Sequence, residues 1–219
     1  MENYDDDVPT LSAETLLALQ QFYDERNEQI EKFNLDVKNA TTEIKFEENW
    51  QLSQFWYDET TIRELSQACI NACPPGGSIA LISCPSLYQA TEKIRGDRTV
   101  KLFEFDTRFA VFGEDFVKYD YNSPKEISQK HIGAFDVVVC DPPFLSQECL
   151  SKTSTTVKLL SKGKIVLCTG AVMNEEAEKC LKVKKCIFEP HHEHNLGNEF
   201  WCYANFDFDS CFEGSQQKS

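Results

Sequence analysis

Apolar residues recur along the chain in two alternating patterns, short β-branched runs and longer stretches with helical spacing. The short runs are typical of strands that are covered on both faces of a parallel sheet. Strands are predicted at 78–84, 99–106, 115–121, 135–140 and 164–169. Helices are predicted from about Asp58 or Thr60 to the PPGG at 74–77, and over about 86–94, 146–161 and 174–181. This alternation predicts an α/β fold, with a doubly wound, mostly parallel sheet and helices on both faces.

The two ends of the chain depart from this alternation. Ser12 can cap a helix that runs to about Ile30, and the segment 183–206 predicts two strands joined by a polar loop, an antiparallel pair at one edge of the sheet. The expected organisation is a disordered acidic arm at 1–9, a helix and connecting loop at 10–48, one main domain at 49–208 and a disordered tail at 209–219.

The net charge of the chain bears on the kind of partner that it can bind. The 219 residues include 36 acidic and 22 basic side chains, which gives a net charge of −14. The densest basic group, Lys182, Lys184 and Lys185, is small. Because an acidic surface repels phosphates, the balance opposes a nucleic-acid partner and favours a basic partner or a small cofactor.

Signals for membranes and secretion are lacking in the pattern. No apolar run approaches the roughly 20 residues of a membrane span, and the acidic start MENYDDDVPT lacks the apolar segment of a secretory signal. The ten cysteines show no C-x-x-C spacing, and Cys84, Cys140 and Cys168 lie in or at the ends of apolar strands. We therefore expect reduced thiols in the cytosol or nucleus and no membrane contact. Burial in an apolar strand also makes Cys140 a poor nucleophile.

Carboxylates follow three successive predicted strands. Glu104 and Asp106 end the second strand, Asp120 and Tyr121 end the third, and Asp141 follows the fourth. Ligands of open parallel sheets bind outside the carboxyl ends of the strands, so one site can hold all of these groups. Each acid alone is equally well explained as a strand stop or a helix cap. An acid after a second strand is placed to accept the hydroxyls of a ribose, and Asp120 could receive an adenine amino group.

The turn after the first strand reads SCPSLY, residues 83–88. It lacks G-x-G-x-x-G, which opposes NAD because a pyrophosphate needs a close backbone approach at that turn. A cofactor without phosphates tolerates such a turn better, and S-adenosyl-L-methionine is one. The pattern therefore favours this cofactor over a dinucleotide.

The fourth strand ends in DPPF, residues 141–144. The prolines at 142 and 143 cannot donate backbone hydrogen bonds and fix the loop. Asp141 and the carbonyl of Pro142 are then two fixed acceptors that suit an amine, and Phe144 offers a face for an aromatic base or an alkyl stem. If the amine is a lysine, removing its proton at neutral pH costs roughly 4–5 kcal/mol, which an apolar pocket reduces.

Two clusters keep more than one interpretation. The aromatic residues Trp50, Phe55, Trp56 and Tyr57 are explained by core packing or, alternatively, by a lid over the cofactor. The polar residues Asn195, Asn198 and Glu199 suit either substrate contact or the closing of a turn.

The histidine-rich run at 191–194 raises a zinc hypothesis. Adjacent histidines in a loop rarely converge on one ion, and no cysteine lies near them with ligand spacing. We therefore expect no metal.

The DPPF at 141–144 resembles the amino-methyltransferase signature of class I S-adenosylmethionine-dependent enzymes. Longer blocks resemble one family, the lysine methyltransferases that modify translation elongation factor 1-alpha, once labelled as N6-adenine DNA methyltransferases. These blocks are NWQLSQFWY (49–57), CPSLYQ (84–89), FEFDTRFAVFGEDFVKYDYNSP (103–124), CDPPFLSQECLSKTSTTVKLL (140–160), GKIVLCTGAVM (163–173) and NLGNEFWCY (195–203). The resemblance covers about residues 10–208.

The resemblance implies a seven-stranded, Rossmann-like methyltransferase sheet in a cytoplasmic enzyme with a basic protein substrate. It implies a catalytic role for Asp141, Pro142, Pro143 and Phe144. It places Asp106, with Glu104, on the ribose-binding acid and Ser83, Cys84, Pro85 and Ser86 on the cofactor turn, beside Trp56, Asp120, Tyr121 and Asp141. Substrate contacts are expected at Phe144, Asn195, Asn198 and Glu199.

The expected function is methyl transfer to a lysine of elongation factor 1-alpha by a monomeric enzyme. Two rivals remain: an N6-adenine nucleic-acid methyltransferase, which DPPF alone permits, and a catalytically silent scaffold that keeps the fold. The net charge of −14 opposes the first.

Overall fold

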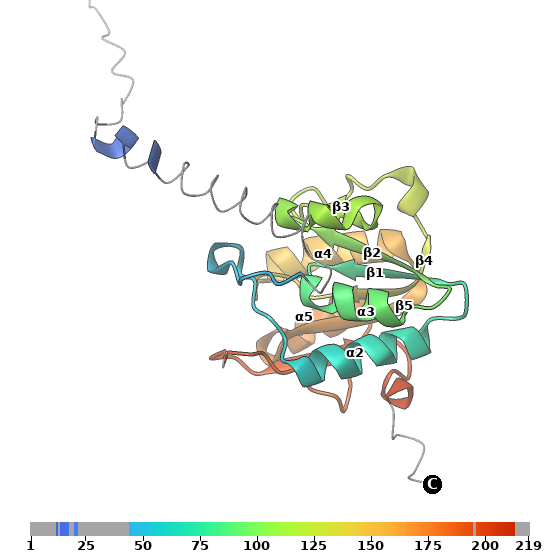
Figure 1. Ribbon diagram of the computed structural model, residues 1–219. Coiled ribbons are helices and arrows are strands. Elements are labelled where there is room, and N and C mark those ends of the chain that lie inside the picture. Colours follow the sequence, from blue (N-terminus) through green and yellow to red (C-terminus); the bar gives the residue numbers. More distant parts are fainter. Residues whose placement is uncertain (1–11, 13, 18–19, 22–43, 195, 213–219) are drawn as a thin grey trace, which may run out of the picture. The chain divides into compact units, whose positions relative to one another are not determined.

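The computed structural model of the protein describes residues 12, 14–17, 20–21, 44–194 and 196–212 (Figure 1). The chain forms two compact units, Met1–Lys45 and Phe46–Ser219. In the first unit, residues 14–17 and 20–21 are helical, and Ser12 Oγ accepts the backbone N–H of Thr15 at 3.2 Å. The cap predicted at Ser12 is therefore present. The remainder of that predicted helix and the predicted arm at 1–9 lie outside the described residues.

The described part of the second unit is built on a seven-stranded sheet with the order β3-β2-β1-β4-β5-β7-β6. The pairs from β3 to β5 are parallel, and β7 is antiparallel to both β5 and β6. The strands are β1 (Ser78–Ile82), β2 (Thr99–Glu104), β3 (Phe116–Lys118), β4 (Phe135–Cys140), β5 (Ser161–Gly170), β6 (Lys184–Lys185) and β7 (Phe200–Ala204). The predicted α/β fold, with its antiparallel pair at one edge, is confirmed.

Helices cover both faces of this sheet (Figure 1). The helices α2 (Glu59–Ala72) and α3 (Tyr88–Ile94) pack on one face, and α4 (Gln147–Leu160) and α5 (Asn174–Leu181) pack on the other. Alternation along β1 serves both layers, because Ile79 and Leu81 belong to the first buried cluster and Ala80 and Ile82 to the second. Short 3₁₀ turns complete the described unit: η1 (Trp50–Leu52), η2 (Pro85–Leu87), η3 (Thr107–Asp115), η4 (Gln129–His131), η5 (Ala171–Met173) and η6 (Asp209–Cys211).

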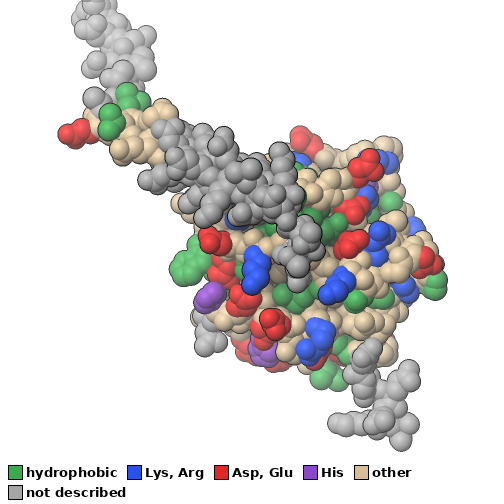
Figure 2. Space-filling model, viewed as in Figure 1, with side chains coloured by type: hydrophobic (Ala, Val, Ile, Leu, Met, Phe, Trp, Pro, Cys, Tyr) green, Lys and Arg blue, Asp and Glu red, His purple; other side chains and the backbone are tan. Residues whose placement is uncertain are grey.

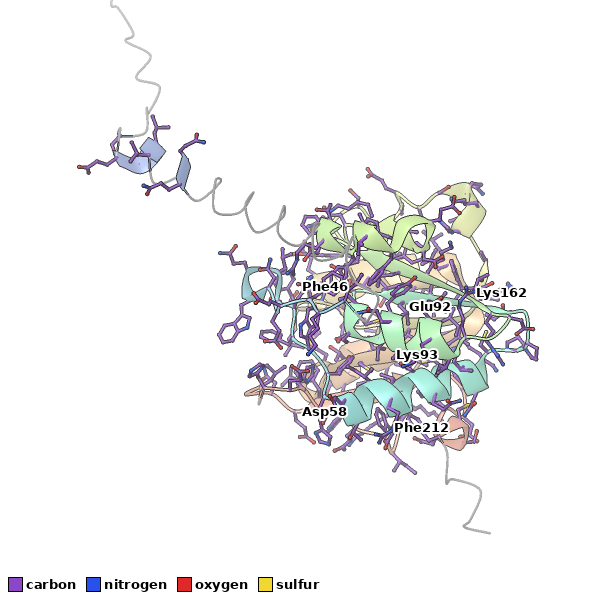
Figure 3. The ribbon with its side chains drawn as sticks, in the orientation of Figure 1. Phe46, Asp58, Glu92, Lys93, Lys162 and Phe212 are labelled. Atoms are coloured by element: carbon purple, nitrogen blue, oxygen red, sulfur yellow. The ribbon has the colours of Figure 1, made fainter. Side chains whose placement is uncertain are left out.

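The helix starts follow from their capping residues. The carboxylate of Asp58, labelled in Figure 3, accepts the backbone N–H of Thr61 at 2.7 Å at the start of α2. Ser146 Oγ accepts the backbone N–H of Cys149 at 3.2 Å at the start of α4. Such caps satisfy amides that have no partner inside the helix. The helix α4 therefore begins directly after the DPPF segment and fixes where that segment ends.

The strand order reverses between β1 and β4, which lie side by side in the middle of the sheet. The chain moves outward from β1 to β3 and then returns to β4 on the other side of β1. At such a reversal the loops after the two strands diverge and leave a crevice at their carboxyl ends. The segments 83–86 and 141–144 both lie at this point.

Two boundaries differ from the sequence-based prediction. The main domain was expected to begin at 49, yet Phe46 packs its ring 4.4 Å from that of Phe109 and belongs to the second unit (Figure 3). The disordered tail was expected from 209, yet Asp209 accepts the backbone N–H of Ile187 at 2.9 Å and Phe212 stacks on Phe188 at 4.5 Å. At each boundary a phenylalanine packs its ring against a ring elsewhere in the second unit, Phe46 against Phe109 and Phe212 against Phe188. Residues 213–219 lie outside the described part.

In the described part of the chain, no helix is long and apolar enough to span a bilayer. On the face of the molecule in Figure 2, acidic and basic side chains are interspersed. Basic side chains do not gather into one patch there.

Candidate active site

A cavity of about 720 Å³ lies at the carboxyl ends of the central strands. This volume is in the range of small-molecule sites. Its floor comes from the segments after β1, β2, β3 and β4. The opposite wall comes from residues 51–56, 192, 196–198 and 200. The lining residues among the predicted site are Trp56, Ser83, Cys84, Pro85, Ser86, Glu104, Asp120, Tyr121, Asp141, Pro142, Pro143, Phe144 and Asn198.

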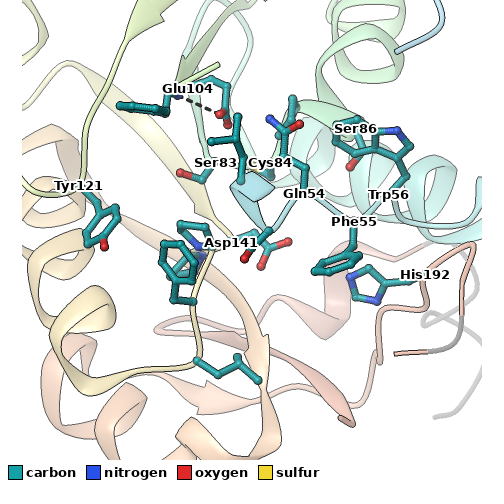
Figure 4. Close-up of a pocket in the computed structure, with 18 of the residues that line it drawn as sticks. Gln54, Phe55, Trp56, Ser83, Cys84, Ser86, Glu104, Tyr121, Asp141 and His192 are labelled. Atoms are coloured by element: carbon teal, nitrogen blue, oxygen red, sulfur yellow. Dashed lines mark hydrogen bonds between the residues drawn. The ribbon is translucent and has the colours of Figure 1, made fainter. Parts of the chain in front are cut away.

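Asp141 sits at the centre of this cavity (Figure 4). Its backbone N–H donates to the carbonyl of Ile82 at 3.0 Å, which continues the pairing of β4 with β1 and fixes the residue. Its Oδ2 accepts a hydrogen bond of 2.5 Å from the hydroxyl of Tyr57. Burial raises the pKa of Asp141 to about 7, the negative charge of Glu104 acts in the same direction, and the bond from Tyr57 opposes them. The carboxyl group therefore changes its charge near neutral pH.

The two prolines and Phe144 extend the floor beyond Asp141. Pro142 is buried and Phe144 is 40% exposed, with its ring 5.9 Å from that of Tyr121 in an edge-on arrangement. Because Ser146 caps α4 directly afterwards, the elbow is held at both ends. The segment thus offers one carboxylate and one aromatic ring on a fixed backbone.

The two acids near the end of β2 have different surroundings. Glu104 is the last residue of β2, lines the cavity, and accepts the backbone N–H groups of Phe105 at 2.9 Å and Asp106 at 3.0 Å. Burial raises its pKa. Asp106 does not line the cavity, because its carboxylate caps η3 at Arg108 N and holds the guanidinium of Arg108 at 2.7 Å and the amide of Gln54 at 3.2 Å. Glu104 therefore lines the cavity, and Asp106 is engaged in packing the wall.

The turn after β1 approaches the cavity through its backbone. Ser83 has φ 54°, in the left-handed region that favours glycine, and its N–H donates to the carbonyl of Phe103 at 2.9 Å. A side chain in this conformation costs roughly 1–2 kcal/mol. The turn therefore takes the shape that a glycine would take, although serine stands there.

The opposite wall joins residues from two distant parts of the chain. Tyr57 and His192 form an isolated antiparallel bridge, flanked by Asp58 N–H to His191 O at 3.0 Å and Glu193 N–H to Trp56 O at 2.9 Å. Figure 4 shows Gln54, Phe55, Trp56 and His192 on the same side of Asp141, with Tyr121 on the other. Of the aromatic cluster, Tyr57 is 1% exposed and Trp50 is 71% exposed, while Phe55 and Trp56 line the cavity. The cluster is thus partly core and partly wall.

Of the remaining predicted site residues, one lines the cavity, one does not, and one lies outside the described part of the chain. Asn198 lines the cavity. Glu199 does not, and its carboxylate accepts the indole N–H of Trp201 at 2.7 Å. Asn195 lies outside the described residues.

The histidine-rich run does not assemble a metal site in the described part of the chain, where no group of three suitable side chains converges. Burial lowers the pKa of His192 to about 4, so this ring is neutral at physiological pH. His194 Nδ1 lies 3.3 Å from Glu48 at the surface.

Several lining residues were not among the predicted site. They are Gln51, Leu52, Ser53, Gln54, Phe55, Phe105, Tyr119, Asn122, Leu145, His192, Leu196, Gly197 and Phe200. Most belong to the segments 51–55 and 192–200, which come together only through the Tyr57–His192 bridge. The alternating aromatic residues before α2 were the available signal, and the antiparallel pairing that places them was not visible in the sequence.

The ionisable side chains that line the cavity are mainly acidic. Among the described residues that line the cavity, the carboxyl-bearing ones are Glu104, Asp120 and Asp141, and none is a lysine or arginine. An acidic, partly aromatic cavity attracts cations and repels phosphates.

The comparisons with known proteins agree with this site. The sequence model of the family described as "Probable N6-adenine methyltransferase" matches residues 48–208. The mouse protein named EEF1A lysine methyltransferase 1 is 49% identical over 208 residues, 94% of this chain and 96% of that protein. Its human counterpart is 50% identical over 205 residues, 93% of this chain and 94% of that protein. The chain belongs to the EEF1A lysine methyltransferase family.

A solved structure shows the fold of this family member independently. The branched-chain polyamine synthase of Thermus thermophilus superposes with a TM-score of 0.55 at 12% identity, covering 80% of this chain and 62% of that one. The class I methyltransferase fold expected from the resemblance is confirmed by the strand order and by the family. The fold and the EEF1A lysine methyltransferase family together imply S-adenosylmethionine as the methyl donor.

Proposed function

We propose that this protein transfers methyl groups from S-adenosylmethionine to the side-chain nitrogen of a lysine in translation elongation factor 1-alpha. The observation that carries the proposal is the one-sided cavity, which has three carboxyl-bearing residues and no lysine or arginine among its described lining. Both the methyl donor and a lysine bring positive charge into such a site. The names of the relatives supply the substrate protein.

The residues present fit the methyl donor. S-adenosylmethionine would supply an electrophilic methyl group on a positively charged sulfur. Glu104, held by two backbone amides at the end of β2, would accept the ribose hydroxyls. Asp120, whose Oδ1 already accepts the backbone N–H of Asn122 at 2.8 Å, would receive the adenine amino group. Gln54 and Trp56 would close the wall over this half of the cavity.

The other half of the cavity would take the lysine. Phe55, Phe144 and Phe200 provide apolar surface for its methylene chain, and Asp141 lies at the end of that path. The aromatic surface around the methylene chain disfavours the charged ammonium and lowers the pKa of the entering amine, whereas the negative charge of ionised Asp141 acts in the opposite direction. The fixed position of Asp141 then orients the nitrogen, and positioning is the main contribution that the protein makes to such a transfer.

The raised pKa of Asp141 assists the loss of the lysine proton. Passing a proton from an ordinary lysine to a carboxylate of pKa 3.8 costs about 9 kcal/mol, whereas a carboxylate of pKa about 7 reduces this to about 5 kcal/mol. Burial of Asp141 therefore lowers the cost by about 4 kcal/mol.

A second candidate is methylation of adenine in nucleic acid, which the description of the matching family supports. Nucleic acid would have to bring its phosphates to the mouth of a cavity lined by Glu104, Asp120 and Asp141. The net charge of −14 adds to this repulsion. Lysine of a protein is therefore the better substrate.

The deciding experiment incubates the protein with isotope-labelled S-adenosylmethionine and, in parallel, purified elongation factor 1-alpha, duplex DNA or RNA. Mass spectrometry of the elongation factor should show added methyl groups on a lysine, with no label in either nucleic acid. Label in adenine and none in the protein would overturn the proposal.

Replacement of the central carboxylate supplies the first prediction. Asp141→Asn keeps the volume and removes the proton acceptor, so kcat/KM at pH 7.5 should fall by about 10²–10⁴-fold. Asp97→Asn, an exposed acid in the turn before β2, is the matched control and should retain wild-type activity. Full activity in Asp141→Asn would remove Asp141 from the reaction.

A further inference from the structure

Tyr57 is the direct protein partner of the central carboxylate. Its hydroxyl lies 2.5 Å from Asp141 Oδ2, and the two residues are separated by 84 positions in the sequence. Charge-assisted hydrogen bonds of this length are among the strongest in proteins. No role of Tyr57 followed from DPPF alone, because the contact depends on the three-dimensional path of the segment before α2.

Core packing and backbone pairing both hold Tyr57 in place. Its side chain is 1% exposed and belongs to the buried cluster between the sheet and α2. Its backbone pairs with His192, whose ring lies 4.9 Å from the phenol ring. Asp58, the next residue, caps α2. A phenol held by backbone and core in this way presents its hydroxyl at one fixed point.

The hydrogen bond from Tyr57 makes the two carboxylate oxygens of Asp141 inequivalent. Oδ2 accepts the hydrogen bond from the phenol, which leaves Oδ1 as the second acceptor of a residue that lines the cavity. A carboxylate with one oxygen fixed cannot rotate about its terminal bond without losing that hydrogen bond. Oδ1 is therefore held in one orientation relative to the floor made by Pro142 and Pro143.

We propose that Tyr57 is a positioning residue for lysine methylation, which fixes Asp141 through Oδ2 so that Oδ1 takes the proton of the incoming ammonium. In this step one N–H bond of the ammonium breaks, an O–H bond forms at Oδ1, and the lone pair stays on the nitrogen. The proton then leaves Asp141 to water. The inference rests on the proposed function and adds the identity of the proton acceptor and of the residue that aims it.

Among the groups around Asp141, the hydroxyl of Tyr57 donates a hydrogen bond that lowers the pKa of Asp141, and it can be removed by a single substitution. The titratable groups that face the pair from the packed elements are Glu104 at the end of β2, Cys84 after β1, Cys140 in β4, Cys168 in β5 and His192 in the loop before β7. Burial raises the pKa of Cys84 and Cys140, and burial lowers that of His192, so these three stay neutral near pH 7. Glu104 raises the proton affinity of Asp141 and Tyr57 lowers it.

Tyr57→Phe tests the proposal because it removes only the hydroxyl. The acid limb of the pH profile of kcat/KM should move to higher pH by about one unit, and the alkaline plateau should also fall because Oδ1 is no longer held in one orientation. Tyr88→Phe is the matched control, since Tyr88 donates a comparable bond of 2.9 Å to Asp115 and does not line the cavity. Its acid limb should stay in place.

A second measurement does not depend on turnover. Infrared difference spectra between acid and alkaline pH report carboxyl protonation, and the band lost in Asp141→Asn identifies this residue. The midpoint of that band should rise in Tyr57→Phe and stay unchanged in Tyr88→Phe. If Tyr57→Phe does not fold, 3-fluorotyrosine at position 57 serves instead. Its more acidic hydroxyl donates a stronger bond, so both midpoint and acid limb should move to lower pH.

The outcomes separate the two proposals. If the wild-type protein does not methylate lysine, the proposed function fails while the infrared midpoint still reports the coupling. If the wild type is active but the acid limb and infrared midpoint do not move in the Tyr57 variant, Tyr57 does not position Asp141. A loss of activity with no shift of the acid limb, or an equal shift in Tyr88→Phe, would also overturn the inference.

Discussion

At the scale of single residues, the proposed methyl transfer uses a carboxyl group placed where its charge is disfavoured. Asp141 has a pKa of about 7 because burial outweighs the hydrogen bond from Tyr57. The raised pKa of Asp141 suits proton transfer, but it also lowers the free energy of unfolding as the pH rises toward 7. The reason is that the folded state binds a proton that the unfolded state has already released.

This linkage predicts a pH dependence of stability. Between pH 5 and 7.5 the native protein loses a proton from Asp141 while the unfolded chain, with an ordinary pKa of 3.8, has almost none left to lose. The free energy of unfolding should therefore fall as pH rises, by roughly 2–3 kcal/mol from this group. Asp141→Asn should flatten the fall by that amount in denaturant titrations at both pH values. An equally steep fall in the variant would assign it to other groups.

At the scale of elements, the end of β2 separates two neighbouring acids. The strand ends at Glu104, and the chain turns into η3 at Asp106, whose carboxylate is enclosed by Arg108 and Gln54. The strand predicted at 99–106 had included both acids. The structure instead separates them by the strand end.

The two acids should therefore respond differently to neutralisation. Glu104→Gln should weaken binding of S-adenosylmethionine by about tenfold or more in calorimetry, because a charge-assisted bond to the ligand is lost. Asp106→Asn should weaken binding less and lower the melting temperature, because Arg108 loses its buried partner. The reverse ranking would restore Asp106 as the ligand-binding acid.

The elements themselves were well predicted from local pattern. The strand 135–140 and the helix 174–181 have the predicted bounds, and α4 starts one residue after its cap at Ser146. Their apolar periods and caps are properties of neighbouring residues, which a sequence displays directly. Trp56 and Asn198 were predicted as site residues and line the cavity. The antiparallel bridge between Tyr57 and His192 was not predicted, because it joins residues 135 positions apart. For the same reason Gln54 and His192 were missed as lining residues.

At the scale of the whole molecule, charge sets the choice of partner. A chain of net charge −14 with an acidic cavity attracts a basic protein over distances that salt controls. Raising ionic strength from about 0.05 to 0.5 M shortens the screening length from above 10 Å to below 5 Å.

The corresponding prediction concerns KM. With elongation factor 1-alpha as substrate, KM should rise about tenfold across this salt range, while the dissociation constant of S-adenosylmethionine, measured by calorimetry, changes by less than twofold because its contacts are enclosed. A KM that does not respond to salt would show that apolar contacts carry the recognition. Added duplex DNA should not compete at any salt concentration.

The bridge between Tyr57 and His192 has a consequence for biosynthesis. Tyr57 precedes β1 in the sequence, and His192 follows β6. The wall of the cavity opposite the strand ends is therefore incomplete until the ribosome has synthesised the loop before β7. A nascent chain that ends before residue 192 can pair its parallel strands but cannot fix Tyr57 against Asp141. Competence for catalysis thus arrives late in synthesis, after most of the sheet has been made.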